Sequence, residues 1–131
     1  MTEAILVTHG DLAAELMRTA RSVFGDFDGC HSVNNAGKTP HTLSEEITKI
    51  LEAGAPGTRY IVFVDFFGGS CCHACLAVEQ AREDVRIVAG VNLPMLLAFL
   101  YKRDEVPFER LPEELISRGR SSIRLVSADD F

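Results

Sequence analysis

The chain has 131 residues, of which 47 % are hydrophobic and 24 % are charged, and its formal net charge at pH 7 is −6. This length and apolar fraction fit one folded domain with a hydrophobic core and exclude an intrinsically disordered protein. The acidic balance, without a Lys/Arg stripe, argues against a nucleic-acid partner. The start of the chain does not read as a signal peptide, and no apolar run approaches the roughly 20 residues that cross a bilayer. We therefore expect a single cytoplasmic domain over residues 1–131.

An apolar strand and an amphipathic helix open the chain. The strand is predicted over residues 3–8, and the helix runs from about Asp11 to Phe24, where Gly25 supplies a stop signal. The apolar residues that recur at helical spacing, and that we expect to face the core, are Leu12, Leu16, Ala20 and Val23.

Strands and helices continue to alternate along the rest of the chain. The pattern predicts a weak strand at 30–33, a strong strand at 60–65, a strand at 85–89 and a candidate last strand at 122–126. Between the strands it predicts a helix that opens at Thr42 or Pro40 and a helix that follows Ser70 and runs to Ala81. Two further helices are predicted after Pro94 and at 111–118, before the candidate last strand. This alternation is typical of an α/β protein with a doubly wound, mainly parallel sheet and helices on both faces.

Polar residues follow two of the predicted strands. His9 comes directly after the first strand, Asp65 ends the strong strand, and Gly68-Gly69-Ser70 leads into the next helix. The carboxyl ends of parallel strands share one edge of a sheet, where α/β proteins place their chemistry. If the two strands are neighbours, Asp65 accepts a hydrogen bond from one ring nitrogen of His9 and leaves the other free to attack. Backbone N–H groups at Gly68 and Gly69, with the Ser70 hydroxyl, would then bind an anion.

Each of these features also has a plain structural interpretation. His9 alone could be a loop residue, Asp65 a turn cap and the two glycines a bend. Their coincidence at two strand ends favours a functional site.

These residues carry a resemblance to a known family. The segments Val7–Gly10, Val64–Ser70 and Ala89–Met95 resemble, in order and spacing, the IIA component of the mannose-type branch of the bacterial phosphoenolpyruvate-dependent sugar phosphotransferase system. The resemblance covers residues 4–126. It implies a phosphocarrier in which His9 accepts a phosphoryl group from phosphorylated HPr and passes it to a IIB subunit. Asp65 would orient the ring and Ser70 would contact the phosphoryl oxygens.

The same resemblance implies an architecture and a set of partners. The strand order would be the flavodoxin-like 2-1-3-4, in one mannose-type IIA domain. The segment around residues 123–126 would cross to the other subunit of a homodimer as an antiparallel fifth strand. No metal or organic cofactor is implied, and the membrane would be reached only through IIC and IID components. In this family a IIA subunit does not contact the sugar, so its sequence does not identify the sugar that is transported.

The chain departs from the family directly after Ser70, where Cys71-Cys72-His73-Ala74-Cys75 replaces the usual Pro-Phe-Asn and small residues. With Cys30 these are the four cysteines of the chain, and their clustering is unlike a secreted disulfide framework. A C-x-x-C at a helix start is the setting of a thiol-redox motif, and the cluster could instead supply metal ligands. Simple packing is the third interpretation. We expect Cys75 to be buried and His73 to be exposed, and leave Cys71 and Cys72 open.

Two aromatic residues lie in the loop before the glycines. Phe66 and Phe67 either flank the His9 cleft and meet partner proteins or pack beneath the loop.

Two related functions share the chemistry expected here. One is a regulatory protein that signals phosphorylation state without sugar transport. The other is the phosphocarrier subunit of dihydroxyacetone kinase, which the stretch Gly90–Met95 fits less well than the mannose type.

Overall fold

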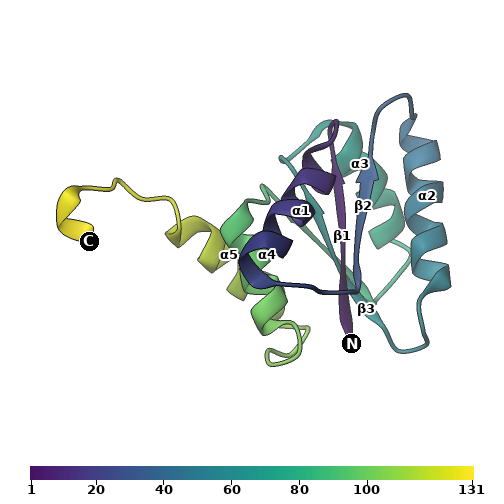
Figure 1. Cartoon of the computed structure of the whole chain (residues 1–131). Helices are drawn as coiled ribbons and strands as arrows, with labels where there is room; N and C mark the ends of the chain where they lie inside the picture. The colour runs from purple at the N-terminus through teal and green to yellow at the C-terminus, as the bar shows by residue number, and fades with distance from the viewer.

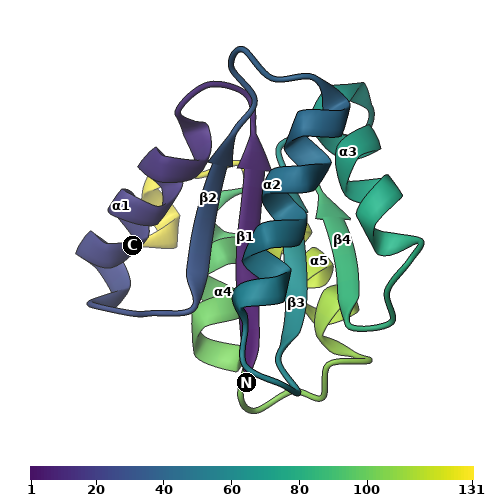
Figure 2. The same cartoon turned by 90° about the vertical axis from the view of Figure 1, so that its right-hand side faces the viewer.

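Four parallel strands form the centre of the molecule. The computed structural model describes residues 1–131 and orders the strands β2-β1-β3-β4 in one sheet (Figure 2). The predicted α/β class and strand order are confirmed, and each strand begins and ends within one residue of its predicted bounds. The strands are β1 (Thr2–Thr8), β2 (Cys30–Asn34), β3 (Arg59–Val64) and β4 (Val85–Ala89).

Helices cover both faces of this sheet (Figure 1). Those on one face are α1 (Leu12–Phe24), α4 (Leu93–Lys102) and α5 (Leu111–Ser121), and those on the other are α2 (Pro40–Ala53) and α3 (Gly69–Glu79). The side chains of β1 alternate between the two hydrophobic cores that result. Ala4 and Leu6 point to the first core, and Ile5 and Val7 point to the second. A strand buried on both faces must be apolar throughout, which explains its continuous run of hydrophobic residues.

The buried face of α1 agrees only in part with the predicted one, because Ala20 is buried and Leu16 packs against the core as predicted. Leu12 and Val23 were predicted to face the core and are exposed, whereas Ala13 and Met17 are buried. The backbone N–H of Ala13 donates to the Thr8 hydroxyl at 2.8 Å, which holds the first helical turn with Ala13 against the sheet. Both faces satisfy the helical period, so the connection from β1 rather than the pattern decides which one is buried.

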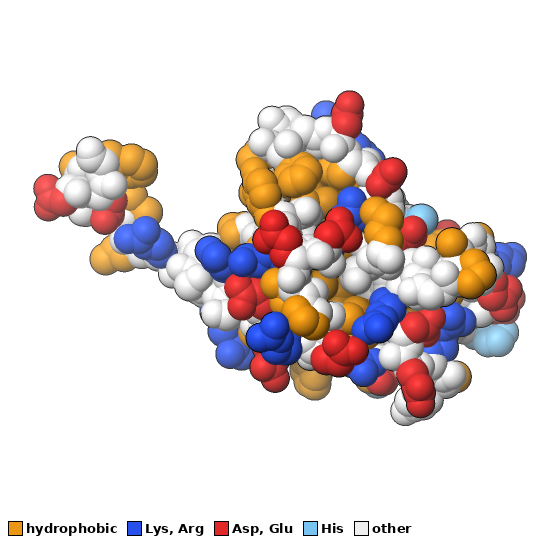
Figure 3. Space-filling view, turned by 90° about the horizontal axis from the view of Figure 1, so that it is seen from below, with side chains coloured by type: hydrophobic (Ala, Val, Ile, Leu, Met, Phe, Trp, Pro, Cys, Tyr) orange, Lys and Arg blue, Asp and Glu red, His pale blue; other side chains and the backbone are white.

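The C-terminal segment forms no strand within this chain. Residues 122–126 extend away from the body of the molecule and end in the short 3-10 helix η1 (Ala128–Asp130) (Figure 1). Ile123, Leu125 and Val126 are exposed, and Figure 3 shows the hydrophobic side chains on this projecting segment. The predicted last strand therefore has no partner strand inside the chain. None of the helices combines the length and apolar content that crossing a bilayer requires.

Candidate functional site

The sheet register brings the ends of β1 and β3 to the same level. Val7 pairs with Val64 across the two strands, so the chain leaves the sheet at neighbouring points toward His9 and Asp65. The predicted proximity of His9 and Asp65 is confirmed, because β1 and β3 are direct neighbours in the sheet. It results from parallel pairing and needs no long loop to bring the residues together.

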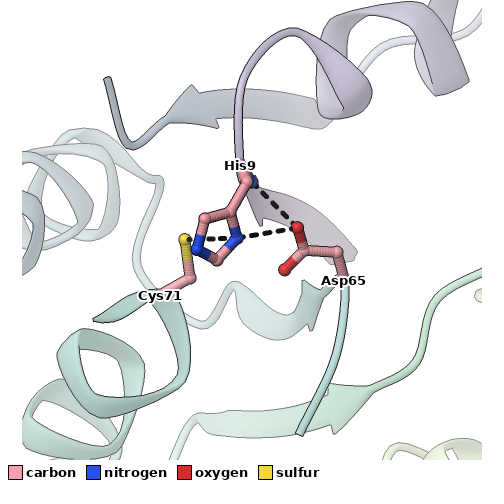
Figure 4. Close-up of side chains that lie close together, drawn as sticks. All are labelled: His9, Asp65 and Cys71. Carbon is pink, nitrogen blue, oxygen red and sulfur yellow. Dashed lines mark hydrogen bonds and ion pairs between the residues drawn. The ribbon is translucent and has the colours of Figure 1, made fainter. Parts of the chain in front are cut away.

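Asp65 holds both the backbone and the ring of His9. Its Oδ2 accepts a hydrogen bond from the His9 backbone N–H at 2.9 Å and lies 2.9 Å from the ring Nδ1 (Figure 4). An ionised carboxylate can only accept, so the proton of a neutral ring sits on Nδ1. The lone pair of Nε2 is then unused. The His9 side chain is 39 % exposed and that of Asp65 only 9 %, so a solvent-facing imidazole rests on a buried carboxylate.

The contact with His9 also affects the ionisation of Asp65. Desolvation by burial opposes its charged form, but the hydrogen bonds from the His9 backbone N–H and ring outweigh that effect. Together they hold the pKa of the Asp65 carboxyl below its ordinary value. Asp65 is therefore ionised throughout the neutral pH range and can stabilise positive charge on the ring.

Phe66 packs directly on the imidazole. The ring centroids of His9 and Phe66 are 4.9 Å apart with an angle of 20° between their planes, which is a stacked arrangement. Phe67 next to it is 89 % exposed, so it does not pack beneath the loop. Phe66 thus flanks the His9 ring and Phe67 is exposed next to it, whereas their contact with partner proteins stays a prediction.

Helix α3 begins beside the same ring. Gly68 and Gly69 have φ values of +96° and +75°, a backbone region that residues with a Cβ rarely adopt. A Cβ on Gly69 would lie 3.1 Å from the Phe66 ring and 3.8 Å from His9 Cε1. The first N–H groups of α3, at Gly69 and Ser70, have no partner within the helix, and Gly69 itself lies beside the imidazole. The half-buried Ser70 hydroxyl makes no hydrogen bond to His9 or Asp65.

The cysteines of α3 face the core rather than solvent. Cys71, Cys72 and Cys75 are all buried, and His73 is exposed, so both expectations for Cys75 and His73 are confirmed. Burial raises the pKa of Cys71, with a further contribution from the Asp65 charge, and raises that of Cys75 to about 12. A reactive redox thiol requires the opposite shift and access to solvent, so this geometry does not favour a thiol-redox motif.

One contact of the cysteine cluster was not predicted from the sequence. The Cys71 Sγ lies 3.8 Å from His9 Nδ1, the same ring nitrogen that Asp65 contacts (Figure 4). Cys72, His73 and Cys75 do not gather into a metal-binding group with Cys71. The one group of three such ligands is His9, Asp65 and Cys71.

The fold and this site define a class of protein: a flavodoxin-like α/β domain with a carboxylate-held histidine at its strand ends. The protein-family model described as "PTS system fructose IIA component" (EIIA-man) matches residues 3–116. The chain therefore belongs to the EIIA-man family of the phosphotransferase system, and the resemblance to the mannose-type IIA component is confirmed.

Individual proteins agree with this assignment. The chain is 33 % identical over 132 aligned positions to the mannose-specific EIIAB component of Escherichia coli (strain K12), covering 98 % of this chain and 41 % of that protein. It is 27 % identical over 128 positions to the fructose-specific EIIA component of Bacillus subtilis (strain 168), covering 97 % and 88 %. The chain thus spans less than half the length of the Escherichia coli relative.

A solved structure confirms the fold. The phosphotransferase system component EIIA from Streptococcus agalactiae superposes with a TM-score of 0.87 over 100 % of both chains, at 18 % identity.

Proposed function

We propose that this chain is a phosphocarrier of a phosphoenolpyruvate-dependent sugar phosphotransferase system, with His9 as the residue that carries the phosphoryl group. The observation that supports it best is the position of the imidazole. Nδ1 of His9 rests 2.9 Å from the Asp65 carboxylate while the side chain remains 39 % exposed. This arrangement leaves Nε2 unprotonated and accessible to a partner protein.

The proposed reaction is a displacement at phosphorus. The Nε2 lone pair attacks the phosphoryl group on HPr, an Nε2–phosphorus bond forms, and the bond from phosphorus to its donor atom on HPr breaks. The ring becomes positively charged because Nδ1 keeps its proton, and the Asp65 carboxylate beside it stabilises this charge. The same steps in reverse, with a IIB subunit as acceptor, complete the transfer.

The start of α3 is the proposed anion site. The free N–H groups at Gly69 and Ser70, and the positive end of the helix dipole, lie beside His9 and favour the phosphoryl oxygens. We assign the Ser70 hydroxyl as an additional donor and Gly68 as the residue that lets the chain turn into the helix. In such transfers most of the catalysis comes from positioning and charge stabilisation.

The proposed partners, HPr and a IIB subunit, come from the family to which the chain belongs. We assign Phe66 and Phe67 to the contact with these partners, because both are exposed and exposed aromatic residues often anchor interfaces. We place this activity in the cytoplasm, with residues 1–131 acting as one EIIA domain and the membrane reached through IIC and IID. We also propose a homodimer, because the outer edge of strand β4 and the exposed apolar segment 122–126 both lack a partner strand.

Phosphorylation of His9 is the direct test. Incubating the chain with phosphoenolpyruvate, enzyme I and HPr should introduce one acid-labile phosphate, and His9→Ala should abolish it. The matched control is His31→Ala, because His31 has a similar side-chain exposure of 38 % and its own carboxylate partner, Glu3, at 2.9 Å. If His9→Ala still accepts phosphate, or if only His31→Ala loses it, the proposal is wrong.

A further inference from the structure

Three potential metal ligands from three separate elements converge beside the imidazole. They are His9 Nδ1 after β1, Asp65 Oδ2 after β3 and Cys71 Sγ in the first turn of α3 (Figure 4). Nδ1 lies 2.9 Å from Oδ2 and 3.8 Å from Sγ, and all three atoms lie within 4.8 Å of one another. The phosphocarrier role uses His9 and Asp65 but assigns nothing to the buried thiol.

These separations suit a tetrahedral zinc ion. Zinc binds sulfur at about 2.3 Å and histidine nitrogen or carboxylate oxygen at about 2.0 to 2.2 Å, so its ligand atoms lie roughly 3.2 to 3.6 Å apart. The Nδ1–Oδ2 and Nδ1–Sγ distances of 2.9 and 3.8 Å bracket this range. Oδ2 and Sγ lie within 4.8 Å of each other, so zinc binding requires the Cys71 side chain to move toward the Asp65 carboxylate. A thiolate and a carboxylate also balance the two positive charges. The sulfur ligand favours zinc over magnesium or calcium, which take oxygen ligands.

We propose that His9, Asp65 and Cys71 bind a zinc ion, with the fourth coordination position open to water, and that the bound ion inhibits phosphoryl transfer. The inhibition rests on the proposed phosphocarrier function, whereas the binding does not. On binding, the Cys71 thiol releases its proton to solvent and a Zn–S bond forms. The proton on Nδ1 leaves that nitrogen, a Zn–N bond takes its place, and Nε2 takes up a proton from water.

Inhibition follows from the change of tautomer. With zinc on Nδ1 the neutral ring carries its proton on Nε2, so Nε2 has no lone pair with which to attack phosphorus. The ion therefore blocks the nucleophile without covering it. The zinc ion would reach the site from the solvent-exposed side of His9, because the His9 side chain is 39 % exposed and that of Asp65 only 9 %.

Binding is tested directly on the full, reduced and metal-free chain. Titration with Zn²⁺ in a calorimeter should show one ion per chain, and Co²⁺ should produce the near-ultraviolet absorption of a cobalt–thiolate bond. Cys71→Ser should lower the zinc affinity at least 10-fold and remove the cobalt band, in line with the loss expected when a metal site is damaged. Cys72→Ser, at the next cysteine, which is also buried, should change neither.

Three results would contradict the proposed metal site. They are the absence of stoichiometric zinc binding, a missing cobalt–thiolate band in the unmodified chain, and an unchanged zinc affinity in Cys71→Ser. The cobalt band is measured without any substitution, so the test stands even if Cys71→Ser does not fold.

A second experiment separates inhibition from binding. Phosphorylated HPr, prepared beforehand and freed of enzyme I, is mixed with the chain in the presence and absence of one equivalent of zinc. The unmodified chain should lose at least 10-fold in transfer rate and recover with a chelator, whereas the Cys71→Ser rate should change little between the two conditions. Zinc binding without any transfer, even in metal-free buffer, would refute the phosphocarrier function but keep the metal site. Transfer that is insensitive to bound zinc would refute the inhibition.

Discussion

At the level of single residues, the reactivity proposed for His9 depends on Asp65. One carboxylate oxygen binds both the backbone N–H and the ring Nδ1 of the histidine, each at 2.9 Å. The first bond fixes where the residue leaves the sheet, and the second fixes the ring and its tautomer. A partner that orients the imidazole this closely also supplies the negative charge that a phosphorylated ring needs.

Replacement of Asp65 by Asn should slow phosphorylation while preserving the fold. Asn has nearly the same shape but no charge, so it orients the ring less firmly and does not stabilise its positive form. We expect the transfer rate from phosphorylated HPr to fall about 10- to 100-fold. Single-turnover transfer measures the rate, and circular dichroism checks the fold. An unchanged rate would contradict the orienting role.

The same variant should reveal the lowered pKa of Asp65 in the pH dependence of stability. The folded pKa lies below the ordinary 3.8, so the ionised form stabilises the fold fully above about pH 4 and loses that effect as pH falls through the folded value. The difference in unfolding free energy between the chain and Asp65→Asn should therefore be larger at pH 7 than at about pH 3. Urea denaturation at both pH values measures this difference in unfolding free energy. The contributions of the other carboxylates cancel in the difference, because both proteins contain them. Equal differences would mean that the contact contributes no ionisation-dependent stability.

At the level of secondary-structure elements, the turn from β3 into α3 shapes the site. Gly68 and Gly69 both have positive φ, but only Gly69 faces the stacked rings. An added Cβ on Gly68 meets nothing within 4 Å, whereas one on Gly69 would press against the Phe66 ring at 3.1 Å. Alanine at Gly68 therefore tests the cost of the backbone conformation without a new contact, whereas alanine at Gly69 adds a steric contact with Phe66.

Gly68→Ala and Gly69→Ala should each lose about 1 to 3 kcal/mol of stability, because both positions have a positive φ that residues with a Cβ rarely adopt. Gly69→Ala should lose more, because the Phe66 ring must move off His9. Removing the ring in the double variant Gly69→Ala/Phe66→Ala should take away that extra cost relative to Phe66→Ala alone. Chemical denaturation of the four variants measures the coupling. If Gly69→Ala costs the same stability with and without the Phe66 ring, the contact with Phe66 does not constrain this turn.

At the level of the whole molecule, an unpaired sheet edge and an unpaired chain segment occur together. β4 pairs only with β3 and stands at one edge of the sheet, and residues 122–126 project from the body without a partner strand (Figure 1). Leu125 is 99 % exposed. An open sheet edge and an apolar extended segment are each unfavourable in water, and pairing them between two copies would remove both. This is the ground for the proposed homodimer with an exchanged antiparallel strand.

Leu125→Asp should weaken the dimer, because a charge would replace an apolar side chain in the proposed interface. Light scattering coupled to size exclusion should give twice the chain mass for the unmodified protein and a shift toward one chain mass for the variant. Leu76→Asp is the control, since Leu76 is an exposed leucine on α3, and it should remain dimeric. A monomeric unmodified protein, or equal dissociation of both variants, would contradict the exchange.

The local pattern of the sequence was enough to predict the four strands of the sheet and to place His9 and Asp65 at the ends of two of them. Ile5 to Val7 and Ile61 to Val64 are continuous apolar runs, which only strands buried on both faces require. Parallel strands end at one edge, so polar residues directly after two such runs become neighbours once the strands pair. The proximity of His9 and Asp65 also requires β1 and β3 to be neighbours, which the family resemblance implied and the sheet order β2-β1-β3-β4 confirms.

Tertiary packing decided the features that have no local signal. Helical spacing allows more than one apolar face, and only the anchoring of Ala13 to Thr8 showed which side of α1 is buried. Likewise, the position of Cys71 against His9 depends on the direction in which α3 leaves its two glycines. A periodic pattern records which residues can share a face, but the rotation and approach of a helix are set by the surfaces it packs against.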